Sequence, residues 1–233
     1  NLGFVTFQPS ELARIVLVLW TADRCVRLAA RVRDLRGGVG PMLVLALVYF
    51  GLIAVETDLG GALLFFMCIL STMWVGGAKP LHVWGAAASV GAAALAVGAT
   101  QEAYIRARLQ MFLGASGNEQ LEGSLRAMQS GGLFGVGLGQ GQFRNHGVPY
   151  LESDFVFAQV GEELGLFGML LLLGLFAAFL WYGLQLVVSI RDRFDALASF
   201  GLLLSTSLQA MLHVQVVCGL APPKGMTLPF ISH

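Results

Sequence analysis

The sequence has 233 residues, of which 56% are hydrophobic and only 12% are charged. Soluble globular domains carry about a quarter charged residues, so this composition indicates a membrane protein. The 14 Lys and Arg residues balance 14 Asp and Glu residues, which excludes the strongly basic surface of a nucleic-acid-binding protein. Cys25, Cys68 and Cys218 are far apart along the chain, a spacing that fits neither a disulfide framework nor a metal cluster.

Stretches without charge predict the membrane spans. A helix needs about 20 mostly apolar residues to cross a hydrocarbon core of about 30 Å. Five charge-free stretches are about this long or longer, and a sixth stretch near the N-terminus is interrupted only by Glu11 and Arg14. The expected fold is therefore an all-α polytopic membrane domain covering residues 1–233, with spans at about residues 4–22, 38–55, 59–76, 81–100, 164–190 and 196–220.

Charge in the loops predicts the orientation of these spans. The segment Asp23–Arg36 contains five arginines and two aspartates, and short basic loops mark the cytoplasmic side of a membrane. Alternation from this loop places 76–79 and 191–195 inside as well, and each of these two short loops carries Lys or Arg. The long segment 101–163 is then extracytoplasmic.

This long outer segment contains the candidate site. Apolar residues recur at helical spacing in Tyr104–Leu113, which predicts a helix lying on the membrane surface. Six glycines occur within Gly131–Gly141, so no regular element is expected there. A loop of this kind can cradle an anion, or it can simply form a tight re-entrant turn packed against helices. No strand precedes it, which argues against a nucleotide fold.

Acidic residues gather at the end of the outer segment. Glu152, Asp154, Glu162 and Glu163 precede or begin a long apolar span, and such low-dielectric surroundings favour carboxylates that transfer protons. Asp154 is the best candidate for a general base. The competing interpretation is that Ser153 or Asp154 only caps the next helix, with Glu162 and Glu163 solvated or paired.

Five blocks in order along the chain carry a family resemblance. The chain resembles the SEDS family (shape, elongation, division and sporulation), typified by FtsW and RodA. The blocks are Phe7–Arg14, Thr57–Gly61, Gln129–Gly137, Ser153–Gly165 and Pro223–Ser232.

The resemblance implies a ten-helix membrane fold, of which we expect this chain to be an internal fragment lacking about three helices before it and one after it. The Pro-Lys-Gly sequence at Pro223 resembles the division-type FtsW branch more than the elongation-type RodA branch. Three positions depart from the family pattern. Arg14 replaces a usual Lys, Tyr150 replaces a usual Glu and His233 replaces a usual Tyr.

The resemblance also implies an activity and partners. SEDS proteins are peptidoglycan glycosyltransferases that polymerise lipid II, the undecaprenyl-pyrophosphate-linked disaccharide pentapeptide, outside the bacterial cytoplasmic (inner) membrane. Their essential aspartate maps onto Asp154. Implied partners are a class B penicillin-binding transpeptidase and other division proteins. A divalent cation such as Mg²⁺ or Mn²⁺ could assist the leaving group, but no compact ligand set assigns one. The candidate substrate-binding residues are Glu11, Arg14, Arg108, Gln129, Ser130, Glu152 and Lys224.

Other interpretations stay open at this stage. Glu11 and Arg14 lie on one helix face and could line a cavity or form a structural ion pair. A lipid II flippase would also use charged residues within a bundle, although the later spans carry almost none. A noncatalytic scaffold of the division machinery is the third possibility. Asp58 could be only a helix cap.

Overall fold

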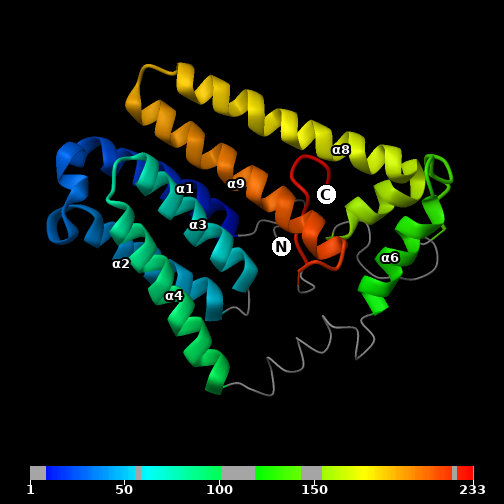
Figure 1. The fold of residues 1–233 in the computed structure, drawn as a ribbon, viewed down its shortest axis with the longest axis horizontal. Coiled ribbons are helices and arrows are strands. Elements are labelled where there is room, and N and C mark those ends of the chain that lie inside the picture. The colour runs from blue at the N-terminus through cyan, green and yellow to red at the C-terminus, as the bar shows by residue number, and fades with distance from the viewer. Residues whose placement is uncertain (1–8, 56–58, 101–118, 143–153, 222–224, 233) are drawn as a thin grey trace. The chain divides into compact units, whose positions relative to one another are not determined.

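A computed structural model describes residues 9–55, 59–100, 119–142, 154–221 and 225–232. The regular elements among these residues are all helices (Figure 1), in agreement with the predicted all-α class. In chain order they are α1 (Pro9–Leu28), the 3-10 helix η1 (Ala29–Arg33), the π-helix η2 (Leu35–Val39), α2 (Gly40–Val55), α3 (Leu59–Val75), α4 (Pro80–Thr100), α6 (Glu119–Gly131), α8 (Val156–Ser189) and α9 (Arg193–Val217).

The bounds of α2, α3 and α4 lie close to the predicted spans 38–55, 59–76 and 81–100, but α1 and α8 differ from the prediction. Helix α1 runs from Pro9 to Leu28 against a predicted 4–22, and so includes Asp23, Arg24 and Arg27, which were predicted to lie in the inner loop. Within the described residues, the segments Leu35–Ile53, Val156–Ser189 and Arg193–Val217 are long and apolar enough to cross a membrane, and Gly60–Val75 is a shorter apolar helix. The span predicted to begin at residue 164 belongs to α8, which begins earlier, at Val156.

The chain divides into two compact units. The first comprises Asn1–Ala96 and Tyr182–Ser205, and the second comprises Val97–Trp181 and Thr206–His233. Helices α8 and α9 each contribute to both units.

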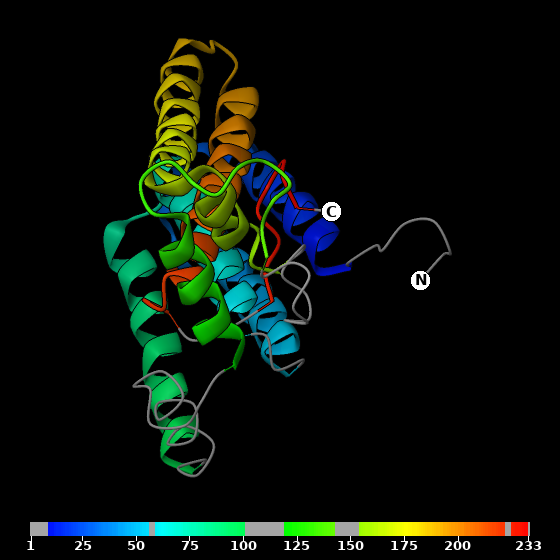
Figure 2. The ribbon, with the colours of Figure 1, turned by 90° about the vertical axis from the view of Figure 1, so that its right-hand side faces the viewer.

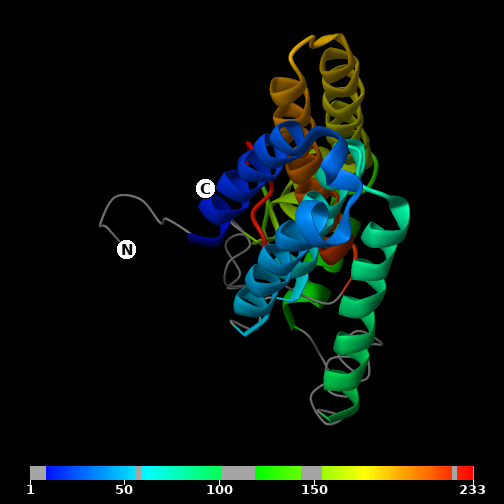
Figure 3. The same cartoon turned by 90° about the vertical axis from the view of Figure 1, so that its left-hand side faces the viewer.

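In the first unit, α1, α2 and α3 pack together (Figure 3). Their core contains Phe65 and Phe66 of α3, each 1% exposed. Glycines allow the closest approaches: a Cβ on Gly201 of α9 would lie 2.4 Å from Val18 Cγ1 and 2.8 Å from Thr72 Oγ1. Because no side chain stands at position 201, this part of α9 packs closely against α1 and α3.

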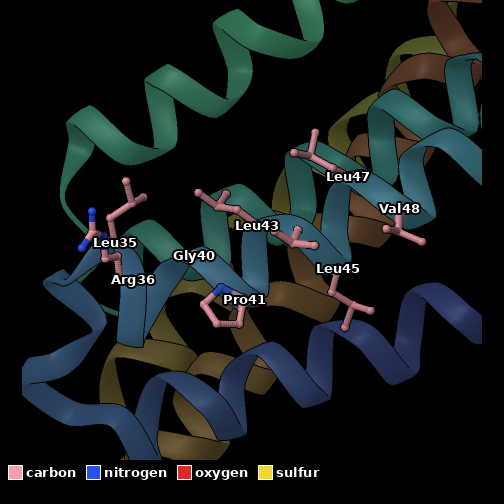
Figure 4. Close-up of a pocket in the computed structure, with 9 residues that line it drawn as sticks. Leu35, Arg36, Gly40, Pro41, Leu43, Leu45, Leu47 and Val48 are labelled. Atoms are coloured by element: carbon pink, nitrogen blue, oxygen red, sulfur yellow. The ribbon is translucent and has the colours of Figure 1, made fainter.

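An apolar groove of about 680 Å³ follows the start of α2 in the first unit (Figure 4). Pro41, Leu43 and Val48 line its apolar part, and Arg36 lies at one end. The helix therefore changes here from an arginine-bearing turn to a fully apolar segment, as expected at a membrane interface.

The second unit contains α6, most of α8 and the end of α9. Phe155 and Phe157 pack with Ala127 of α6 and Val217 of α9 in one apolar cluster. A second cluster joins Val156 to Ala210 and Leu228. Figure 2 shows α6 and the turn that follows it beside the beginning of α8. The start of α8 is thus surrounded by packed residues, and this start carries the candidate site.

Candidate functional site

Asp154 lies two residues before α8 and is half-buried. The next residues anchor it: Phe155 is 2% exposed and belongs to one apolar cluster, while Val156 belongs to the other. Because consecutive side chains are buried on different partners, the backbone at Asp154 has little freedom to turn. The sequence Asp-Phe-Val-Phe therefore fixes a carboxylate at the edge of an apolar core.

The carboxylate of Asp154 points at the backbone of Gly225. A Cβ on Gly225 would lie 2.6 Å from Asp154 Oδ2 and 3.2 Å from its Cγ. Ordinary van der Waals contacts begin at about 3.4 Å, so only glycine at this position leaves room for the carboxylate in its present place.

The segment that carries Gly225 is held by polar side chains of α9. His213 Nδ1 lies 2.6 Å from the carbonyl oxygen of Met226, and because a carbonyl only accepts, the ring nitrogen donates. Gln209 Nε2 donates to the carbonyl oxygen and to Oγ1 of Thr227, at 3.2 Å each. Gln209 and His213 are four residues apart and so share one face of α9.

Helix α8 is interrupted at Gly165, whose φ of 67° and ψ of −164° are not helical. In a continuous helix, the N–H groups of Leu166 and Phe167 would donate to the carbonyls four residues earlier. Here they donate instead to Gly132 O at 2.9 Å and Leu133 O at 3.2 Å.

The glycine-rich turn also supplies donors for the two carbonyls left at this interruption. Val136 N donates to Glu162 O at 3.0 Å, and Gly137 N donates to Glu163 O at 3.1 Å. The turn is therefore inserted into the interruption of α8, and the backbone groups on both sides are satisfied. A Cβ on Gly165 would clash with Gly135 N, and a Cβ on Gly135 would clash with Glu163 O, so both positions require glycine.

The carboxylates of Glu162 and Glu163 hold the same turn. Glu162 is 2% exposed and its Oε1 accepts a hydrogen bond from Gln142 N at 2.7 Å. Glu163 is 9% exposed and its Oε2 accepts from Gly139 N at 3.0 Å. The sequence left these two residues as either solvated or paired. The structure excludes the solvated alternative, because the turn covers both carboxylates and its N–H groups replace water as donors.

These contacts decide between the two interpretations of the glycine-rich turn. The N–H groups of Val136 and Gly137 donate to backbone carbonyls, and those of Gly139 and Gln142 donate to two carboxylates, which would also repel an anion. The structure therefore does not support the anion-cradle interpretation. The alternative, a tight turn packed against helices, is confirmed, and residues 132–142 contain no helix.

The other candidate residues are dispersed. Gln129 and Ser130 end α6 in the second unit, where both are exposed and Ser130 Oγ donates to Ala127 O at 2.7 Å. Glu11 and Arg14 are half-buried on α1, in the first unit. The remaining candidates, Arg108, Glu152 and Lys224, lie outside the described residues. The same is true of Asp58, Tyr150, Ser153 and the helix expected at residues 104–113.

Three contributors to the site were not predicted from sequence: Gly225, Gln209 and His213. Gly225 and the two α9 side chains act on the neighbourhood of Asp154 through packing across the chain. The available signal was the spacing of Gln209 and His213 by one helical turn in an otherwise apolar span, which indicates a shared polar face. Within the described residues, no group of three His, Cys, Asp or Glu side chains could hold a metal ion.

The fold and the site define a multi-pass helical membrane protein with an acidic site where α8 begins. The family model FTSW_RODA_SPOVE, described as a cell cycle protein, matches residues 1–233. The chain belongs to this family, the SEDS family, and is a multi-pass protein of the bacterial cytoplasmic membrane.

Curated relatives match the chain over its whole length. It is 34% identical to a probable peptidoglycan glycosyltransferase FtsW of Coxiella burnetii, covering 100% of this chain and 64% of that protein. A relative of the same name from Thioalkalivibrio sulfidiphilus is 36% identical, with coverage of 100% and 60%. Stage V sporulation protein E of Bacillus subtilis is 31% identical, with coverage of 100% and 65%. The chain thus spans less than two thirds of these relatives.

Two solved structures are similar. One, described as showing the structural coordination of polymerization and crosslinking by a peptidoglycan synthase complex, has a TM-score of 0.75 and 26% identity, covering 99% of this chain and 65% of that chain. The other is a mutant of the rod shape determining protein RodA from Thermus thermophilus, with a TM-score of 0.61, 26% identity and coverage of 100% and 61%.

Proposed function

We propose that this chain carries the catalytic part of a peptidoglycan glycosyltransferase that polymerises lipid II at the outer face of the cytoplasmic membrane during cell division. Asp154 is its general base. The observation that carries this proposal is the placement of the Asp154 carboxylate, half-buried beside an apolar core and facing a backbone without a side chain at Gly225. The names of the relatives, probable peptidoglycan glycosyltransferase FtsW, support the same activity.

The chemistry requires a group such as Asp154. The 4-hydroxyl of the acceptor sugar is a weak nucleophile at neutral pH, so a hydrogen-bonded carboxylate takes its proton as the oxygen attacks the anomeric carbon of the donor. A new glycosidic C–O bond forms, and the bond between the anomeric carbon and the pyrophosphate oxygen breaks. Undecaprenyl pyrophosphate leaves with the bonding electron pair.

The leaving pyrophosphate gains from cationic partners. Because the carboxylates of Glu162 and Glu163 lie against the glycine-rich turn and would repel an anion there, arginines of the outer segment are the better source of positive charge. Arg126 on α6 is exposed and pairs with Glu122 at 3.2 Å. Arg108 and Lys224 are proposed for the same task.

A transpeptidase partner is part of this proposal. The solved complex of similar fold is described as coordinating polymerization and crosslinking, which supports a class B penicillin-binding transpeptidase as partner of the full-length protein. On α4, Gly85, Ala88 and Ala92 are exposed and share one face, a pattern that allows close packing of a second transmembrane helix.

The test uses the full-length protein with its transpeptidase in liposomes and purified lipid II as substrate. The native protein should produce glycan chains on a gel, and Asp154→Asn should reduce turnover by about 10² to 10⁴-fold with little change in lipid II binding. A flippase would instead move lipid II across the bilayer without forming polymer. Full turnover by the Asp154→Asn variant would remove Asp154 from the base role.

A further inference from the structure

Glu163 lies between two hydrogen-bond donors that come from different parts of the second unit. Its Oε1 accepts from Gln159 Nε2 at 3.0 Å, one helical turn earlier on α8. Its Oε2 accepts from the backbone N–H of Gly139 in the glycine-rich turn at 3.0 Å. The side chain of Glu163 therefore ties the first part of α8 to the turn.

The contact with Gly139 needs an acceptor at position 163, because a backbone N–H can only donate. The side-chain amide of Gln159 can turn over and present either its N–H or its oxygen. A glutamine at position 163 can therefore keep both contacts. An apolar residue such as leucine can make neither, and it would leave Gly139 N–H without this acceptor in a site that is 9% exposed.

The tie matters because the first part of α8 is not continuous with the rest of the helix. The interruption at Gly165 separates the segment 156–164, which follows Asp154, from the long apolar helix. The segment packs on α6, where a Cβ on Gly161 would lie 2.8 Å from Met128 Cγ. Its direction is thus set by α6 and by the turn inserted at the interruption, since the N–H groups of Leu166 and Phe167 donate to the turn and not to the preceding turn of α8.

We propose that Glu163 and Gln159 are positioning residues for the glycosyl transfer, because they hold the glycine-rich turn in the interruption of α8 and so fix the direction of the segment that carries Asp154. This inference rests on the proposed function of Asp154. Neither residue is assigned a contact with substrate. Their effect is on how often the Asp154 carboxylate is in place for proton transfer.

The first experiment is Glu163→Leu, which removes both contacts, in the full-length protein with its transpeptidase, using lipid II in liposomes. A misplacement of about 1 Å can lower a rate about 10²-fold, so kcat should fall by about 10-fold to 100-fold while KM changes little. The acid limb of the pH–rate profile should keep its midpoint, because Asp154 still takes the proton. Loss of that limb would make Glu163 the base and would overturn the inference.

The second experiment restores the hydrogen bonds with the conservative variant. In Glu163→Gln, the amide oxygen accepts from Gly139 N–H and the NH₂ group donates to the turned-over amide of Gln159. Both hydrogen bonds return, so kcat should recover to within a few-fold of the native value. Gln159→Leu removes only the contact with Glu163 Oε1, so its loss should be smaller than in Glu163→Leu, and the cycle of these two leucine variants should be non-additive.

The matched control is Glu122→Leu. It makes the same chemical change on α6, where the carboxylate is exposed and pairs with Arg126 one turn away on the same helix. Its kcat should stay near the native value. Thermal unfolding in detergent, measured on every variant, separates a lower rate per folded molecule from a smaller folded fraction.

Two results would overturn the inference: a native kcat in Glu163→Leu, or no recovery in Glu163→Gln. Failure of the proposed function looks different. If Asp154→Asn kept its turnover while Glu163→Gln still recovered the rate lost in Glu163→Leu, Asp154 would lose its role and the tie between Glu163 and the turn would stand.

Discussion

Gly225→Ala tests the placement of the Asp154 carboxylate most directly. The added Cβ would lie 2.6 Å from Asp154 Oδ2, and reaching a contact of about 3.4 Å requires a movement of roughly 0.8 Å. The Gly225 φ lies outside the positive range, so alanine fits the backbone. The nearest atoms belong to the free end of a side chain, which can rotate. The fold should therefore survive while the base is displaced.

The expected result is a loss of kcat of up to about 10²-fold, the cost of a misplacement of about 1 Å, with the unfolding midpoint within a few degrees of the native value. The assay is glycan-chain formation from lipid II by the full-length protein. Gly174→Ala on α8 is the matched control, because a Cβ there meets nothing within 4 Å. A native rate in Gly225→Ala would refute the argument that this carboxylate position is the catalytic one.

Three further predictions concern the fold, the orientation and the partner. Gly165→Ala should lower the unfolding midpoint, because alanine at a φ of 67° is strained by about 1 to 3 kcal/mol and its Cβ would meet backbone atoms of the turn; an unchanged midpoint would contradict the inserted turn. A cysteine replacing exposed Leu138 should react with an impermeant thiol reagent outside spheroplasts, and one replacing Arg33 should not; the reverse pattern would invert the topology. Ala88→Leu with Ala92→Leu should weaken copurification of the transpeptidase, and unchanged copurification would exclude this face of α4.

The extent of the helices was largely predictable from the absence of charge. Helix α3 runs from Leu59 to Val75 against a predicted 59–76, and α2 runs from Gly40 to Val55 against a predicted 38–55. These boundaries can be predicted from composition because charged side chains are costly in the lipid hydrocarbon. The first and last charged residues around an apolar stretch therefore mark approximately where the helix enters and leaves the membrane.

The start of α8 was not predictable by the same argument. Glu162 and Glu163 are charged and lie directly before the charge-free stretch, so the predicted span began after them, at residue 164. In the structure both lie inside α8 and are buried. Their donors are backbone N–H groups of a turn about twenty residues earlier in the chain. Local hydropathy contains no information on such a long-range contact. The prediction therefore placed these two buried carboxylates in the outer segment and outside the helix.

The same limit applies to the candidate site. Asp154 could be chosen from sequence because a carboxylate before an apolar helix is locally visible. Gly225 belongs to a motif that the sequence shows. The need for glycine at this position comes from the close approach of Asp154 Oδ2, and this contact is visible only in the structure. Local sequence therefore indicated the proposed base, and long-range packing identified the residues that surround it.

The last prediction concerns the support that α9 gives to the segment around Gly225. His213 is 1% exposed, its Nδ1–H donates to Met226 O at 2.6 Å, and its Nε2 has no partner among the described residues. In His213→Leu the Met226 carbonyl loses this donor, and an unsatisfied buried group costs about 1 to 3 kcal/mol. We expect a lower unfolding midpoint and, because the segment is freed to move from Asp154, a lower kcat as well. His213→Asn, whose shorter amide presents an N–H near the same position, should keep more of both. Equal losses in the two variants would mean that the volume of the ring, and not its hydrogen bond to Met226, is what the segment needs.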